Sequence, residues 1–254
     1  MELKVLGCSG GVGSRLRTTT LLIDDDILID AGTGLGDLSL QAMSSIRHIF
    51  ITHSHLDHIT SIPFLVDTLF DSIQQPIIIH AQAETIDALK KHIFNNVIWP
   101  DFSKLPSQEN PVMKYEVMTA GEVIEINHRK IEMIPVKHIV PGVGYRVESK
   151  TGSFAFSGDT STNDTFWQAL NKHEKLDVLL VESAFTNKDI SLCHLSGHYC
   201  AELLGPDISK LKLKPEVYIS HNKPGAEGKI FSECQKAITT HTIHPLSGGH
   251  SFTL

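Results

Sequence analysis

The sequence predicts an α/β fold in which two β-sheets pack face to face between outer helices, a four-layer αββα sandwich. The chain has 254 residues, 41% hydrophobic and 20% charged, which suits a large layered core and excludes disorder, collagen and coiled coil. Predicted strands outnumber helices in each half, and the two halves resemble each other. With no linker or repeat between them, we expect residues 1–254 to form a single domain.

The first half is predicted to alternate short strands with two helices. Residues 3–6 form an apolar strand that ends at the glycine-rich stretch 7–13, and residues 21–23 and 27–29 flank three aspartates as a hairpin. Further strands are expected at 46–52 and 77–79, and helices at 59–69 and 84–94. Residues 95–120 contain Pro100, Pro106 and Pro111, so we expect them to be irregular, as an insertion or a lid.

The second half repeats this style with more strands. Apolar runs predict strands at 131–136, 143–147, 153–156, 178–181 and 217–219. Helical spacing predicts helices at 164–170, about 199–210 and 230–238. Two similar sets of strands with helices between them favour two sheets packed together.

Charge and composition exclude several classes of protein. The net charge is −7 without a long block of one sign, so an extended nucleic-acid surface is not expected. No apolar run is long enough to span a bilayer, and the first residues lack the pattern of a signal peptide, which predicts a cytoplasmic protein without a membrane contact. The four cysteines contain no CxxC pair and predict neither a disulfide framework nor a zinc ribbon.

Fifteen histidines are many for a chain of this size, and four candidate metal ligands fall within six residues. These are His53, His55, Asp57 and His58, directly after an apolar strand. A strand end followed by a tight turn can direct such side chains to one point. Imidazole and carboxylate ligands suit zinc, manganese or iron.

Other candidate ligands share one property, because each follows a hydrophobic strand. They are His138, Asp159, Glu182 and His221. Ligand sites in layered α/β folds gather beyond strand ends, where loops converge. We therefore expect these residues to meet the histidine-rich turn in one shared site.

This set of motifs resembles the metallo-β-lactamase superfamily over nearly the whole chain. The resemblance implies its four-layer fold and two divalent metal ions, with zinc favoured over manganese or iron. His53, His55 and His138 would hold one ion, and Asp57, His58 and His221 the other. Asp159 would bridge the two.

Within the superfamily, the pattern His53-x-His55-Leu-Asp57-His58 is similar to class II cyclic-nucleotide phosphodiesterases. The implied substrate is a small phosphodiester, attacked by a hydroxide between the two metals, with Asp57 among the catalytic residues. His198, oriented by Glu182, is the expected proton donor to the leaving oxygen, with His194 as the alternative. The glycine-rich stretch 7–13 is interpreted as a tight turn near the metal site, because it lacks the P-loop lysine.

Other functions stay open. A tRNA 3′-processing endonuclease of the same superfamily usually carries a long arm between the positions of His138 and Asp159, where only twenty residues stand here. A thioester or lactam hydrolase, a di-iron redox protein and a non-catalytic metal-binding protein are further alternatives. The superfamily often dimerises, so a homodimer is also considered.

Overall fold

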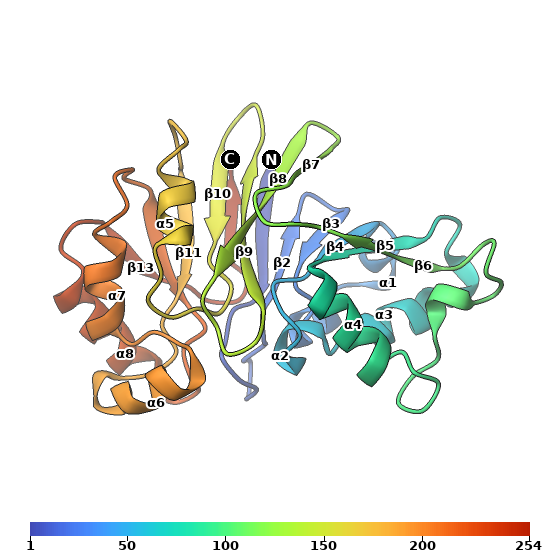
Figure 1. Cartoon of the computed structure of the whole chain (residues 1–254), viewed down its shortest axis with the longest axis horizontal. Coiled ribbons are helices and arrows are strands. Elements are labelled where there is room, and N and C mark those ends of the chain that lie inside the picture. The colour runs from blue at the N-terminus through green and yellow to red at the C-terminus, as the bar shows by residue number, and fades with distance from the viewer.

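The computed structural model describes all residues 1–254 and contains two seven-stranded sheets that pack face to face (Figure 1). The first sheet has the order β14 (Ser251–Thr253), β1 (Glu2–Gly7), β2 (Thr20–Ile23), β3 (Ile27–Ile29), β4 (His48–Phe50), β5 (Ile77–Ala81), β6 (Met113–Val117). The second has the order β13 (Ile243–Pro245), β12 (Glu216–Ser220), β11 (Val178–Glu182), β10 (Ser153–Phe156), β9 (Gly142–Glu148), β8 (Arg129–Val136), β7 (Val123–Ile126). The predicted αββα architecture is confirmed.

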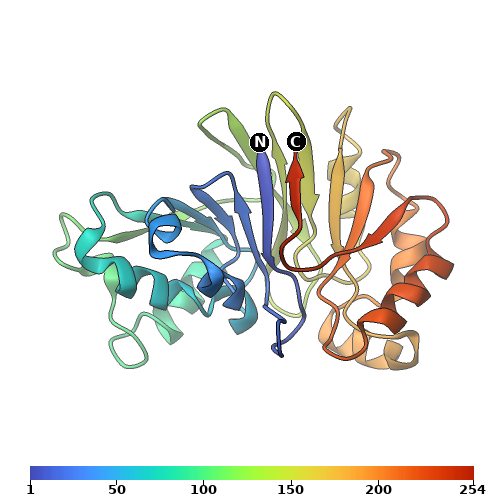
Figure 2. The same cartoon turned by 180° about the vertical axis from the view of Figure 1, so that it is seen from behind.

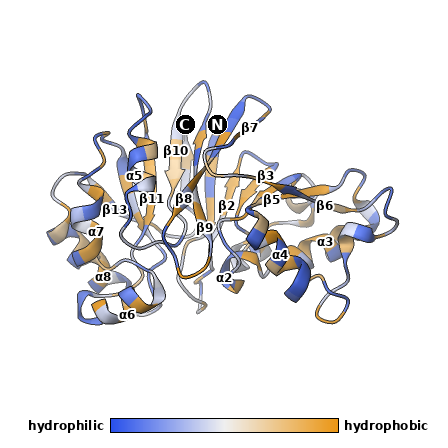
Figure 3. Ribbon diagram, viewed as in Figure 1, coloured by the Kyte–Doolittle hydropathy of each residue, from blue (hydrophilic) through white to orange (hydrophobic).

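Alternation along the strands divides the apolar residues among three layers. In β3, Ile27 and Ile29 point into the core between the sheets, whereas Leu28 packs with α3 (Ile62–Leu69) and α4 (Ala83–His92). This follows from the two-residue period of a strand. Figure 3 shows the hydrophobic residues concentrated along the strands.

The outer face of the second sheet is covered in the same way by three helices. They are α5 (Thr165–Leu170), α7 (Ala201–Ile208) and α8 (Glu227–Ala237). Trp167 of α5 is 1% exposed, and its indole Nε1 donates to Asp207 at 3.0 Å. The two ends of the chain lie side by side (Figure 2), because β1 pairs with β14 in antiparallel fashion.

The structure corrects some predicted boundaries. The helix expected over 59–69 is two helices, α2 (Leu56–Ile59) and α3, because Pro63 in the first turn of α3 cannot continue a helix from α2. Part of the stretch expected to be irregular forms β6, which pairs in parallel with β5. The strand expected over 46–52 is limited to β4.

Several elements were not predicted from the sequence. They are β6, β7, β13, β14, α1 (Leu40–Met43) and α6 (Ile190–Ser196). No helix of the chain has both the length and the apolar character that crossing a membrane requires.

Candidate metal centre

The histidine-rich turn leads from β4 into α2 and includes the first residues of this helix. His53 and His55 precede this helix, and Asp57 and His58 belong to it. The ring centroid of His53 lies 4.6 Å from that of His55 and 4.2 Å from that of His58. The turn therefore brings its side chains to one point, as expected from their spacing.

Residues distant in sequence complete the cluster from the ends of β8, β10 and β12. His138 Nε2 lies 3.2 Å from His55 Nδ1. Asp159 Oδ2 lies 3.6 Å from His53 Nε2 and 3.3 Å from His58 Nε2, and Asp159 Oδ1 lies 3.2 Å from His221 Nδ1. The residues predicted from strand ends thus meet the histidine-rich turn.

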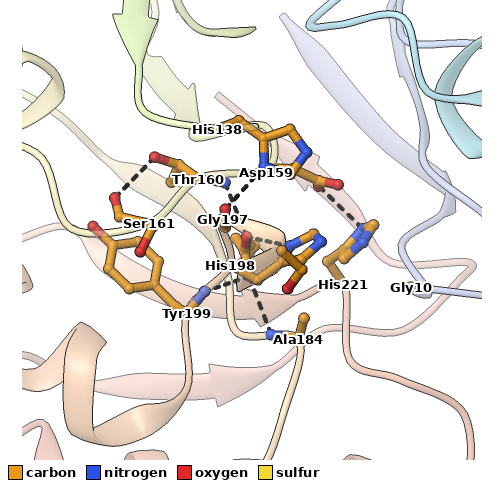
Figure 4. Close-up of polar contacts among 12 residues, drawn as sticks. Gly10, His138, Asp159, Thr160, Ser161, Ala184, Gly197, His198, Tyr199 and His221 are labelled. Atoms are coloured by element: carbon orange, nitrogen blue, oxygen red, sulfur yellow. Dashed lines mark hydrogen bonds and ion pairs between the residues drawn. The ribbon is translucent and has the colours of Figure 1, made fainter. Parts of the chain in front are cut away.

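The side chains form two potential metal sites that share Asp159. Figure 4 shows Asp159 close to His138, His198 and His221. One group contains His53, His55, His138 and Asp159, and the other contains Asp57, His58, Asp159 and His221. Asp57 Oδ2 lies 3.8 Å from His221 Nε2, and its side chain is 30% exposed. The second group therefore opens to solvent at Asp57.

Several buried polar atoms in this cluster lack a hydrogen-bond partner, which fits a site for cations. They are His53 Nε2, His58 Nε2, Asp159 Oδ1 and both ring nitrogens of His221. Buried polar atoms in folded proteins are normally satisfied, so these atoms require ligands of their own. Neutral imidazole and carboxylate are the donor types that zinc, manganese and iron accept.

Burial and charge set the protonation of the cluster. Burial lowers the pKa of His221 to about 3 and that of His138 to about 4, so both imidazoles are neutral at physiological pH, as ligation requires. His58 differs: burial opposes its charge, but the carboxylates of Asp159 and Asp30 outweigh burial and raise its pKa.

Hydrogen bonds from groups outside the cluster orient the side chains that could bind metal. His138 Nδ1 lies 2.9 Å from the carbonyl oxygen of Gly197, and His58 Nδ1 lies 2.6 Å from Asp30 Oδ2. Asp30 is fully buried and accepts hydrogen bonds from the amide and hydroxyl of Thr52. The sequence interpretation missed Asp30, although it follows the apolar strand β3 and so carries the same signal as the other strand-end residues.

A buried pair lies next to Asp159. His198 Nδ1 is 2.8 Å from Glu182 Oε1, and Glu182 also accepts the amides of Thr160, Ala184 and Tyr199. Burial alone would lower the pKa of His198, but the Glu182 carboxylate outweighs it and raises that pKa.

The position of the His198 ring fits a proton donor at the site. It stacks on His221 with a centroid distance of 5.3 Å. His194, the alternative donor, is exposed on α6 and belongs to none of the ligand-type groups.

The glycine-rich stretch packs against the strand end that carries His221. Gly10 N donates to Asn222 O at 3.0 Å, and a Cβ atom at Gly10 would lie 2.4 Å from the carbonyl oxygen of His221. Only glycine allows this approach. The stretch lies beside the cluster, where it was predicted to lie.

A family model described as beta-lactamase superfamily domain matches residues 25–208. The chain belongs to this superfamily, which confirms the resemblance inferred from the motifs.

Two sequence relatives and one solved structure show what this chain is similar to within the superfamily. A probable 3′,5′-cyclic-nucleotide phosphodiesterase of Yersinia pestis is 27% identical over 88% of this chain and 78% of its own length. A ribonuclease Z of Haloarcula marismortui is 31% identical over 57% of this chain, which spans less than half (46%) of that protein. The crystal structure of unliganded yeast PDE1 superposes with a TM-score of 0.83 at 19% identity, covering 100% of this chain and 99% of the other.

Proposed function

We propose that this protein is a metal-dependent hydrolase of small phosphodiesters, with 3′,5′-cyclic nucleotides as the substrate class. The observation that carries the proposal is Asp159, a carboxylate shared by two ligand-type groups and adjacent to the Glu182–His198 pair. The similarity to the Yersinia pestis phosphodiesterase supports the substrate class.

The first metal would be held by His53, His55, His138 and Asp159, and the second by Asp57, His58, His221 and the same Asp159. Two divalent cations in such a site polarise a phosphate and lower the pKa of a bound water. We assign zinc to both positions, with manganese and iron as the alternatives that these donors also accept.

The chain's own residues supply proton transfer. His198, with its Nδ1 hydrogen-bonded to Glu182, presents its other ring nitrogen as the proton donor to the leaving oxygen. Asp57, which is 30% exposed at the opening of the second group, would accept a proton from the attacking water.

RNA processing is the second candidate, and the ribonuclease Z relative supports it. The net charge of −7 argues against it, because binding a long phosphate backbone requires a basic face. A small diester needs no such surface.

Substrate profiling tests the proposal. Purified protein loaded with Zn²⁺ or Mn²⁺ is assayed with cyclic AMP, cyclic GMP, bis(p-nitrophenyl) phosphate and a precursor tRNA. We expect metal-dependent hydrolysis of a cyclic nucleotide and no cleavage of the tRNA. Cleavage of the tRNA alone would contradict the proposed substrate class, and no hydrolysis of any of them would contradict the enzyme function.

The cytoplasmic location and the homodimer stay predictions. Light scattering of the purified protein measures the oligomeric state.

A further inference from the structure

A cavity of about 700 Å³ lies behind the glycine-rich turn, and none of the candidate metal ligands lines it. Its volume is typical of pockets that bind small molecules. Its walls come from the end of β1, residues 15–17 and the connection between β13 and β14, which crosses the back of the molecule in Figure 2. Asn222 also lines it, so the cavity and the metal centre share one wall.

Ser9 lines this cavity, and its hydroxyl is a buried polar group without a partner. The residue is 8% exposed, and its Oγ forms no hydrogen bond within the protein. A buried hydroxyl without a partner destabilises the fold unless a water or a ligand satisfies it. Ser9 therefore brings to this wall an unsatisfied hydroxyl, which is able to donate to an oxygen of a molecule that reaches it.

Arg15 provides an unpaired positive charge at the same wall. The Arg15 side chain forms no ion pair. Its backbone has a φ of 64°, in the left-handed region. The neighbouring Arg17 is already paired with Asp37 at 3.1 Å. Glu227 is the remaining charged residue of the wall and has no ion pair either. Arg15 is thus the one guanidinium of the cavity that is free to bind an anion.

The rest of the wall is suited to an apolar body. Leu6, Leu16 and Leu246 line the cavity. Gly248 lines it too, and a Cβ atom there would meet only the carbonyl oxygen of Leu6, at 3.6 Å. Aliphatic side chains with open space beside them accommodate a flat organic group.

We propose that this cavity binds an organic phosphate monoester, with the phosphate at Arg15 and Ser9 and the organic body against the three leucines. A guanidinium matches a phosphate through paired hydrogen bonds. Glu227 is then available to accept a hydrogen bond from the organic body. The inference depends on residues outside the metal centre and stands independently of the proposed hydrolysis.

The test uses adenosine 5′-monophosphate as the probe and adenosine, which lacks the phosphate, as the matched ligand. The metal-loaded protein is titrated while backbone amide NMR signals are followed. We expect the amides of Ser9, Gly248 and Gly249 to shift with the monophosphate and to shift far less with adenosine.

Variants locate the binding. Arg15→Gln removes the charge and should weaken binding at these amides about tenfold, the loss typical for a hydrogen bond to a charged group. Gly248→Phe fills the cavity and should abolish the shifts. Arg47→Gln, the same substitution at an arginine away from the cavity, should leave the affinity unchanged.

Two results would overturn the inference. One is a set of shifts confined to the metal centre, at Gly158 and Gly197, that Arg15→Gln and Gly248→Phe leave intact. The other is equal binding of adenosine and its monophosphate. A protein without phosphodiesterase activity would still give a clear answer here, because the readout is binding at the cavity.

Discussion

Replacement of His198 by Asn tests the role of the Glu182–His198 pair most directly. His198 is 7% exposed, and Glu182 Oε1 holds its Nδ1 at 2.8 Å, so the ring is fixed and its proton is retained by the neighbouring carboxylate. General acids of this kind contribute about 10²- to 10⁴-fold in rate, or about 3–5 kcal/mol. We therefore expect kcat for a cyclic nucleotide to fall by that factor.

The leaving group separates proton donation from a structural role. An alkoxide needs a proton when it departs, whereas p-nitrophenolate does not. With bis(p-nitrophenyl) phosphate, His198→Asn should lose no more than about tenfold. The control is His194→Asn, at an exposed position on α6, which should behave as wild type with both substrates.

Metal analysis completes this experiment. His198 forms a group with Asp159 and Glu182 but belongs to neither of the two four-residue groups, so the variant should retain its metal. An equal loss with both substrates, or a loss of metal, would show that His198 supports the cations and is not the proton donor.

Three further predictions concern carboxylates. Asp57→Ala and Asp159→Ala should abolish hydrolysis, and Asp159→Ala should also lower the metal content measured by elemental analysis; full activity in either variant would refute the assigned roles. Asp30→Ala should weaken metal binding about 10- to 100-fold, because Asp30 orients His58; unchanged affinity in a chelator competition would contradict this. Burial opposes the charge of Asp26, but Arg129 outweighs it and lowers the pKa below 3.8. The resulting stabilisation is present above that value and lost as the pH falls through the folded-state pKa. Asp26→Asn should therefore reduce the unfolding free energy by about 1–3 kcal/mol near neutral pH, and by less as the pH falls through the lowered folded-state pKa of Asp26, as denaturant titrations would measure.

The interior of the fold could be predicted from the sequence, but the sheet edges could not. Central strands such as β10 and β11 are buried on both faces and consist of continuous apolar runs. The edge strands β6 and β7 lack this signal, because Val117 is 55% exposed and Val123 is 51% exposed. Pairing with a neighbouring strand makes them strands, and a local pattern does not contain that information.

In the candidate site, too, local sequence patterns predict some residues, whereas contacts with distant residues cannot be predicted from them. Residues of ligand type at the ends of apolar strands could be found because strand ends converge at one edge of the sheets. Asp30 follows an equally apolar strand, β3, and therefore carries the same signal. The hairpin aspartates Asp24 and Asp26 are bound by Arg129 of β8 and join the two sheets. The arginine partner is 103 residues distant from Asp26, so no local pattern could reveal it.

The buried atoms without partners link the fold to the proposed chemistry. Five such atoms lie in the metal centre, on His53, His58, Asp159 and His221. Each unsatisfied buried group costs about 1–3 kcal/mol, so a chain selected for stability alone would replace them with apolar side chains. Two bound cations would satisfy four of these atoms, because a neutral imidazole offers a metal only one ring nitrogen of His221. The binding free energy of the cations would then stabilise the folded state by mass action. The cluster is therefore best explained as a site whose side chains are positioned for cations before the cations bind.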